Sequence, residues 1–231
     1  DGTYPVARKL VELAQYYNFE GYFINQETSM PNNEGYSEEF DNFMRYAKKY
    51  AAEKNHKHFN FSWYDSMSEA GQRYHGDAVD EYNRFFMKKD DEGKNSVDEF
   101  FMNFNWRKSH VDKTVQHMKE LGRNPYEAYA GWELQKGGYT NTQQKVQDLI
   151  DENGIPKLSL GLFVPDIVMG SVENFEDFHK KEQGFWTGFK GDPSTSDDSN
   201  AWSGIARFVV DKTPILEPLF HSTFNTGHGR G

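Results

Sequence analysis

Hydrophobic residues recur with helical spacing along residues 5–17, which predicts an amphipathic helix that starts at Pro5 and ends before Asn18. The next apolar run, residues 22–24, consists of β-forming residues and is short enough to be one buried strand. It changes abruptly into polar residues from Asn25 onward. Because side chains alternate between the two faces of a strand, Asn25 and Glu27 are expected to point the same way.

The same alternation of a helical pattern with a short apolar strand returns along the chain about five times. Residues 67–94 are predicted to hold a loop and a helix, and the part after residue 164 is predicted to be irregular, with a last apolar segment at 204–210. The other predicted helices are 37–51, 108–121 and 142–152, and the other predicted strands are 58–64, 99–105, 126–133 and 158–164.

Strands that alternate with helices predict an α/β fold with a parallel sheet. Such sheets carry their functional sites at the carboxyl ends of the strands, in a closed (β/α)8 barrel as well as in an open doubly wound sheet. A dinucleotide-binding sheet is disfavoured, since no Gly-x-Gly-x-x-Gly follows a strand. We therefore expect a (β/α)8 TIM barrel, of which this chain holds the later strands, about five βα units.

The predicted domain organisation follows from the number of strands, because a closed (β/α)8 barrel needs eight and this chain is predicted to hold about five. Residues 1–213 are assigned to the partial barrel, and residues 214–231 to a segment that leads toward a further domain. Barrel strands are expected before Tyr4 in the parent protein. Without them the barrel would have open edges and an uncovered apolar interior. We therefore expect residues 1–231 alone to be poorly soluble.

Composition narrows the chemistry further. Aromatic residues form 16% of the chain, more than a core needs, which favours a groove that stacks flat ligands such as sugar rings or bases. The net charge of -10 then disfavours nucleic acid, because phosphate binding needs clustered Lys and Arg. The chain has no cysteine, and His56 and His58 lack a third ligand nearby, so no metal or cofactor is expected. No apolar run approaches the ~20 residues of a membrane span.

Polar or aromatic residues stand at the end of each predicted strand, and their order along the chain is distinctive. The series is Phe23-Ile24-Asn25-Gln26-Glu27-Thr28, Ser62-Trp63-Tyr64-Asp65-Ser66, Phe100-Phe101-Met102-Asn103-Phe104-Asn105-Trp106, Tyr129-Ala130-Gly131-Trp132-Glu133, Ser159-Leu160-Gly161-Leu162-Phe163-Val164-Pro165 and Phe224-Asn225-Thr226-Gly227-His228-Gly229. This series closely resembles the catalytic barrel of glycoside hydrolase family 85, the endo-β-N-acetylglucosaminidases. Glu133-Leu134-Gln135 adds to the resemblance, which covers essentially the whole chain.

The resemblance implies hydrolysis of the β-1,4 bond between the two core N-acetylglucosamines of N-glycans, with transglycosylation as a possible second outcome. It implies that Glu27 is the general acid/base, that Asn25 holds the 2-acetamido group of the substrate, and that Tyr64 is an active-site tyrosine. The acetamide oxygen of the substrate would attack the anomeric carbon, giving an oxazoline-like intermediate and net retention.

The chemistry of these residue types agrees with the implied roles. A leaving sugar oxygen must be protonated, and a carboxylic acid such as Glu27 can do this. A side-chain amide such as Asn25 can orient the attacking acetamide by hydrogen bonding without becoming a competing nucleophile.

Further residues at the strand ends are candidates for substrate binding, and each has a plainer interpretation. Asp65 contacts substrate, orients Tyr64 or caps the next element. Trp106, by the resemblance, lines the sugar sites, but it would also suit the core. Glu133 contacts a sugar hydroxyl or pairs with a Lys or Arg. The full set of candidates is Trp63, Asp65, Asn103, Trp106, Glu133 and Gln135.

Two other functions remain open on the sequence. One is a two-carboxylate retaining glycosidase that uses Glu27 with Asp65 or Glu133, whose carboxyl groups would lie ~5 Å apart. The other is a non-catalytic barrel that binds glycans in its aromatic groove. The expected partner in all three cases is a glycan, and an extracellular or cell-surface location in a bacterium is favoured over the cytoplasm.

Overall fold

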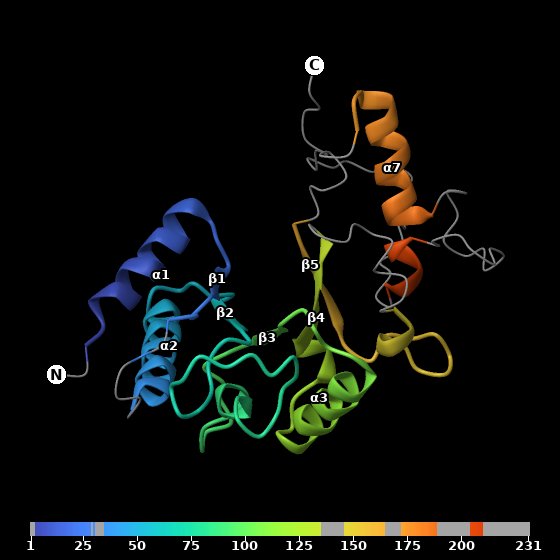
Figure 1. Cartoon of the computed structure of the whole chain (residues 1–231). Helices are drawn as coiled ribbons and strands as arrows, with labels where there is room; N and C mark the ends of the chain where they lie inside the picture. Colours follow the sequence, from blue (N-terminus) through green and yellow to red (C-terminus); the bar gives the residue numbers. More distant parts are fainter. Residues whose placement is uncertain are drawn as a thin grey trace. The chain divides into compact units, whose positions relative to one another are not determined.

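The computed structural model of the chain describes residues 3–28, 30, 35–134, 146–164, 172–188 and 204–209 (Figure 1). The chain divides into two compact units, which are described separately below. Unit 1 comprises Asp1–Gly131 with Lys157–Gly161, and unit 2 comprises Trp132–Pro156 with Leu162–Gly231.

Five strands form one sheet, in which they follow each other in the order of the chain. β1 pairs with β2, β2 with β3 and β3 with β4, each time in parallel. Parallel neighbours need a crossover connection, and the connections observed here confirm the predicted α/β fold. The strands are β1 Gly21–Ile24, β2 Asn60–Tyr64, β3 Glu99–Met102, β4 Ala128–Glu133 and β5 Ser159–Phe163.

Proline, asparagine and glycine residues mark several of the helix ends. Pro5 occupies the first turn of α1, and Asn18 ends the helix in the left-handed region, with a φ of 59°. Gly122 follows α3 with a φ of 64°, a conformation that ends the helix and suits glycine. The α-helices are α1 Pro5–Tyr17, α2 Tyr36–Glu53, α3 Lys108–Glu120 and α7 Phe175–Thr187, and the 3-10 helices are η1 Arg84–Met87, η2 Pro125–Glu127 and η3 Ile205–Phe208.

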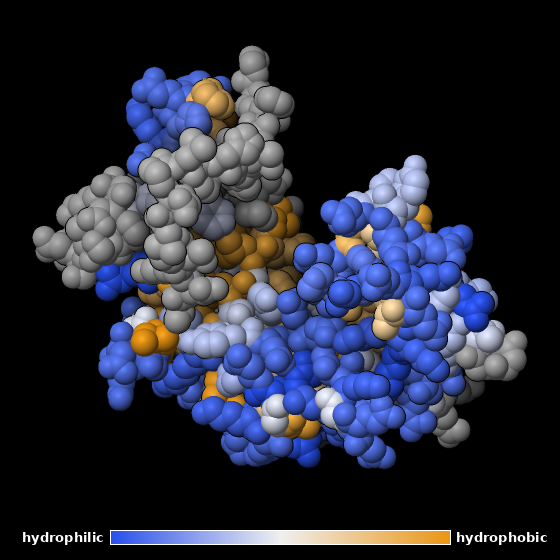
Figure 2. All heavy atoms as spheres, turned by 180° about the vertical axis from the view of Figure 1, so that it is seen from behind, coloured by the Kyte–Doolittle hydropathy of each residue, from blue (hydrophilic) through white to orange (hydrophobic). Residues whose placement is uncertain are grey.

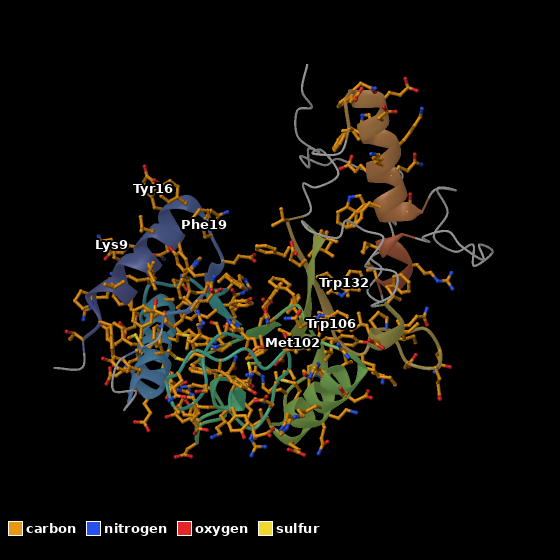
Figure 3. All side chains as sticks on the ribbon, viewed as in Figure 1. Lys9, Tyr16, Phe19, Met102, Trp106 and Trp132 are labelled. Carbon is orange, nitrogen blue, oxygen red and sulfur yellow. The ribbon has the colours of Figure 1, made fainter. Side chains whose placement is uncertain are left out.

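The helix-facing side of the sheet in unit 1 forms a packed core. α1 and α2 lie side by side (Figure 1), where Tyr4 before α1 packs edge-on against Phe43 of α2. From β1, the Tyr22 hydroxyl donates to the carbonyl of Leu10 in α1 at 2.7 Å. From β3, Met102 is fully buried, and the Thr114 hydroxyl of α3 lies 3.7 Å from its sulfur (Figure 3).

The opposite face of the sheet carries an aromatic cluster. The rings of Phe23, Tyr64 and Phe101 lie within 5.6–6.1 Å of one another, so one aromatic residue from each of three neighbouring strands meets here. Glycines on the next strands make room for the Phe101 ring. A Cβ atom at Gly161 would lie 2.2 Å from that ring, and one at Gly131 would lie 2.7 Å from it.

Several sequence-based boundaries need correction. α7 was not predicted, although Asn174 caps it by accepting the Asp177 N–H at 2.9 Å, and Phe178 and Phe185 are buried along it. The predicted strand 99–105 ends at Met102. Of the predicted helix 142–152, residues 146–149 are helical, and Ile150 already pairs with Pro156 in an antiparallel bridge.

The predicted helix within residues 67–94 is also wrong, because only the short η1 forms there. Local side-chain contacts compete with a helix in this segment. The N–H of Asp80 donates to the Asn83 side chain at 2.8 Å, and the Asp80 carboxylate accepts the N–H of Tyr82 at 2.9 Å. The result is an ordered loop that contributes to the site described below.

Hydrophobic side chains are exposed near the edge of the sheet. In the described part of the chain, β1 pairs only with β2, and Phe23 is 51% exposed. Tyr16 and Phe19, at the end of α1, are 80% and 50% exposed (Figure 3). Figure 2 shows a mainly hydrophilic surface on this unit, interrupted by hydrophobic patches. Poor solubility of residues 1–231 alone stays a prediction, as does the barrel boundary at residue 213, which lies outside the described residues.

The contact between Phe101 and Gly161 yields a test of the fold. We expect Gly161→Ala to lower the free energy of unfolding by about 1–3 kcal/mol, because the new methyl group overlaps the Phe101 ring. Urea denaturation of the protein that carries this chain measures the effect. Phe101→Leu shortens the opposing side chain, so the Gly161→Ala cost should shrink in that background. Equal costs in both backgrounds would show that the two residues do not meet.

Candidate active site

Four of the predicted site residues lie at the carboxyl ends of β1, β2 and β3. Asn25 and Glu27 follow β1 directly and are exposed. Tyr64 is the last residue of β2, and Asn103 comes directly after β3. In the sheet register Tyr64 lies opposite Phe101, so the period of two places Tyr64 and Asn103 on the same face. Their common location is the end of a parallel sheet at which active sites form.

Tyr64 is the best-defined side chain of this group. Its ring lies among Phe23, Phe101 and Phe104, and its hydroxyl donates to Asn103 Oδ1 at 2.8 Å. Burial, together with the smaller effect of the negative charges of Glu27, Asp65 and Asp77, raises the pKa of the phenol to about 12. Tyr64 is therefore protonated at neutral pH and serves as a hydrogen-bonding group.

Asp65 is not exposed to substrate, which corrects its prediction as a binding residue. Its side chain is fully buried, because it points to the opposite face of the sheet from Tyr64. Oδ1 accepts the backbone N–H of Gly76 at 3.1 Å and the side-chain amide of Asn83 at 3.0 Å, and Oδ2 accepts the N–H of Asn103 at 3.4 Å. Asp65 thus ties the ends of β2 and β3 to the loop that holds Gly76 and Asn83.

The pKa of Asp65 reflects two opposing effects. Burial raises the pKa of its carboxyl group to about 7, while the N–H donors of Gly76, Asn103 and Asn83 act in the lowering direction. Desolvation is the larger effect. The carboxyl group consequently changes its charge in the neutral range, unlike an exposed aspartate.

Two tryptophans predicted to contact substrate are packed into the protein instead. Trp63 is fully buried, with its ring stacked on Phe86 at 4.2 Å between centroids. Trp106 is 1% exposed, and its indole N–H donates to the carbonyl of Gly131 at 2.7 Å (Figure 3). Neither ring offers a free face to a sugar in this structure. The prediction for Trp63 fails for a simple reason, because it alternates with Tyr64 and so points to the helices.

The last two candidates are not placed with this group. Glu133 ends β4 in unit 2, where it is half-buried. Gln135 lies outside the described residues. Their assignment to substrate binding stays a prediction.

A loop that the sequence reasoning did not single out completes the site. Asp77 accepts two hydrogen bonds on Oδ1, from the Asn103 side-chain amide at 2.8 Å and from the Asn105 backbone N–H at 3.0 Å. The dipeptide Gly76-Asp77 signals a turn. Nothing in the sequence, however, indicates that this turn folds back onto the end of β3.

The described residues show neither a metal site nor a membrane helix. Among them, no three His, Cys, Asp or Glu side chains gather closely enough to hold a metal ion. None of the helices within the described ranges has the length and apolar character that crossing a bilayer requires.

Together these features define a class of protein. An exposed carboxylate, a neighbouring amide and a protonated tyrosine stand at the carboxyl ends of parallel strands, above an aromatic layer. This arrangement is typical of the TIM-barrel fold, in which side chains at these strand ends form the functional site.

The chain belongs to glycosyl hydrolase family 85, which it matches over residues 1–231. The fold is similar to the Endo-D glycoside hydrolase domain from Streptococcus pneumoniae R6, with a TM-score of 0.83 and 46% identity, covering 90% of this chain and 33% of that chain. The cytosolic endo-beta-N-acetylglucosaminidase of Homo sapiens is 28% identical over 189 residues, 78% of this chain and 23% of that protein. The cytosolic endo-beta-N-acetylglucosaminidase 2 of Arabidopsis thaliana is 24% identical over 227 residues, 96% of this chain and 28% of that protein. The chain thus spans about a quarter of the length of these curated relatives.

The buried carboxyl group of Asp65 leads to a pH-dependent prediction. Its pKa of about 7 exceeds the ordinary value of 3.8, so the folded protein keeps a proton that the unfolded chain releases. Asp65 therefore lowers the free energy of unfolding progressively between about pH 4 and pH 7, by a few kcal/mol at most. In Asp65→Asn this dependence is absent, and we expect its stability to rise relative to the unmodified protein as the pH increases across that window.

Urea denaturation at several pH values from 4 to 8 measures this difference. Asp91→Asn is the matched control, because Asp91 is exposed on the tip of a loop and its surroundings change little on unfolding. A constant difference between Asp65→Asn and the unmodified protein across the window would contradict the assignment of the raised pKa to Asp65.

Proposed function

We propose that this chain carries the active site of an endoglycosidase that cleaves the β-1,4 bond between the two core N-acetylglucosamines of N-glycans. The observation that carries the proposal is the Asn25-x-Glu27 pair beside a protonated Tyr64, at the strand ends of a chain that belongs to glycosyl hydrolase family 85. The names of its relatives from human and Arabidopsis thaliana, which are endo-beta-N-acetylglucosaminidases, support the same reaction.

The proposed mechanism divides the work between two exposed residues and the substrate. Glu27 donates its proton to the leaving sugar oxygen as the glycosidic bond breaks. The acetamide oxygen of the substrate attacks the anomeric carbon and forms an oxazoline-type ring, with Asn25 hydrogen-bonded to the acetamide. Glu27 then takes a proton from water, which opens the ring and gives net retention. A sugar hydroxyl in place of water would give transglycosylation.

The structure argues against the version of the two-carboxylate mechanism that uses Asp65. A second carboxylate must reach the anomeric carbon, whereas Asp65 is fully buried with both oxygens occupied by N–H donors. The protonated Tyr64 is equally unsuited to nucleophilic attack, since an attacking tyrosine must lose its proton. Substrate assistance therefore fits the described residues of unit 1 better than either protein nucleophile.

We also propose that the parent protein acts outside a bacterial cell, on glycoproteins. The support is a comparison of identities. The bacterial Endo-D domain is 46% identical to this chain, whereas the cytosolic relative from human is 28% identical.

Replacement of the acid/base is the direct test of the proposed function. In the full-length protein, Glu27→Gln keeps the shape of the side chain but cannot donate or accept the catalytic proton. We expect kcat for release of the glycan from a glycoprotein to fall about 10²–10⁴-fold. Glu20→Gln is the matched control, because Glu20 is exposed just before β1, at its other end. Normal turnover by Glu27→Gln would sink the assignment, and glycan binding without any product from the unmodified protein would indicate a non-catalytic binding barrel.

Asn25 can be separated from Glu27 by a second substrate. We expect Asn25→Ala to lose hydrolysis of the natural glycan by about 10²–10³-fold, because the attacking acetamide is no longer oriented. A preformed sugar oxazoline should still be accepted as a donor, since it has already passed that step. Gln26→Ala is the control, because Gln26 alternates with Asn25 and its amide donates to the carbonyl of Thr28. Refusal of the oxazoline together with normal cleavage of the glycan would show that Asn25 has another role.

A further inference from the structure

We propose that Asp77 is a positioning residue, which fixes the direction of the Tyr64 hydroxyl through the side chain of Asn103. This proposal rests on the proposed function, because Tyr64 is taken to face the reacting sugar. It concerns the loop of residues 74–83, hereafter the 74–83 loop, and it assigns a catalytic consequence to a residue that need not touch the substrate.

The three side chains form one continuous set of hydrogen bonds. The Tyr64 hydroxyl and Asn103 Oδ1 are 2.8 Å apart, and Asn103 Nδ2 and Asp77 Oδ1 are also 2.8 Å apart. Both distances lie in the normal range for hydrogen bonds. Each end of the Asn103 amide therefore has a partner within the protein, which places Asn103 between Tyr64 and the 74–83 loop.

The direction of each hydrogen bond follows from one fixed donor. The backbone N–H of Asn105 points to Asp77 Oδ1 at 3.0 Å, so this oxygen is an acceptor. The group of Asn103 that faces the same oxygen must then be its NH2 end, and its carbonyl end must face Tyr64. A carbonyl oxygen can only accept, so the Tyr64 hydroxyl donates its proton to Asn103. The remaining lone pair of the Tyr64 oxygen is left to accept a hydrogen bond from the substrate or from Glu27.

The backbone around Asp77 is held in place by several contacts, so its carboxylate can fix these hydrogen-bond directions. The residue before it, Gly76, is bound through its N–H to the buried Asp65 carboxyl group at 3.1 Å. Farther along the loop, the N–H of Val79 donates to the Thr114 hydroxyl of α3 at 3.0 Å. Asp77 itself has a φ of 53°, in the left-handed region that few residues other than glycine adopt. Strain of this kind persists where the surrounding contacts over-determine the backbone, and it is common at functional sites.

The predicted consequence is a loss of catalysis without a loss of binding. If Asp77 no longer holds Asn103, the amide can turn over and offer its NH2 end to Tyr64. The phenol would then accept a hydrogen bond from Asn103 and point its own O–H into the site. It could no longer accept the hydrogen bond that the substrate or Glu27 donates there. Because the ground-state contacts of the sugars are unchanged, kcat should fall while KM stays nearly constant.

The backbone conformation of Asp77 decides which substitutions are informative. Asp77→Gly removes the carboxylate and tolerates the positive φ, whereas alanine would add strain of its own. Asp77→Asn keeps an acceptor oxygen and also tolerates this conformation, so it is the conservative variant. In the full-length protein acting on an N-glycan, we expect Asp77→Gly to lower kcat about 10- to 100-fold. Asp77→Asn should recover most of this loss.

A comparison in the Tyr64→Phe background tests whether Asp77 acts through Tyr64. If it does, Asp77→Gly should cause no further loss once the hydroxyl is absent, because the two residues then work as one unit. The proposal would be overturned if the fall in kcat of Tyr64→Phe/Asp77→Gly equalled the product of the falls in the two single variants. Failure of Asp77→Asn to recover activity would also overturn it. Asp91→Gly, in the exposed loop tip, is the control for replacing an aspartate by glycine.

A readout that does not need activity keeps this proposal separate from the proposed function. With 3-fluorotyrosine incorporated, Tyr64→Phe identifies the ¹⁹F NMR signal of Tyr64, and Asp77→Gly should shift that signal while Asp77→Asn should shift it less. An unshifted signal in Asp77→Gly would overturn the contact itself. An inactive unmodified protein that shows the expected shifts would instead contradict the proposed function and leave the contact intact. If Asp77→Gly fails to fold, Asn103→Ala takes its place, since it removes the amide that links Asp77 to Tyr64; it should shift the Tyr64 signal in the same way, and an unshifted signal would again overturn the contact.

Discussion

The site in unit 1 depends on one buried carboxyl group. Asp65 accepts hydrogen bonds from Gly76 and Asn83, which belong to a loop, and from Asn103, which belongs to the end of β3. Placing a carboxyl group in the protein interior is costly, and the surrounding N–H donors offset part of that cost. The same contacts hold together the end of β2, the end of β3 and the 74–83 loop, so the position of Tyr64 follows from them.

Side chains alternate between the two faces of the sheet along residues 63–65, at the end of β2. Trp63 and Asp65 point toward the helices, where Trp63 stacks on Phe86 and Asp65 binds the loop. Tyr64 points to the other face and joins Phe23 and Phe101. A period of two is a rigid rule for a strand. The rule that puts Asn25 and Glu27 on one side also implies that Trp63 and Tyr64 cannot both face a substrate.

Sequence patterns predicted the elements that are periodic and missed the structure that is not. α1, α3 and the five strands have clear hydrophobic periods, and they lie close to their predicted positions. The 74–83 loop has no period, since its conformation is set by contacts to residues far along the chain, such as Thr114 and Asn103. α7 is a different kind of miss. Its Asn174 cap and its buried Phe178 and Phe185 are readable signals, which were obscured by the polar residues between them.

The charges around Tyr64 bear on which atom attacks the sugar. Glu27, Asp65 and Asp77 all raise the pKa of its phenol, and burial raises it more than any of them, so a phenolate is strongly disfavoured. Asp65 is buried beneath the strand ends, and Asp77 directs Oδ1 to Asn103 and Asn105. Among the described residues around Tyr64, Glu27 is thus the exposed carboxyl group, and the proposed mechanism assigns the proton transfer to it. Neither Asp65 nor Tyr64 is therefore suited to attack the sugar. An acetamide group on the substrate would supply the attacking oxygen, and the amide of Asn25 lies beside Glu27 in the chain to receive it.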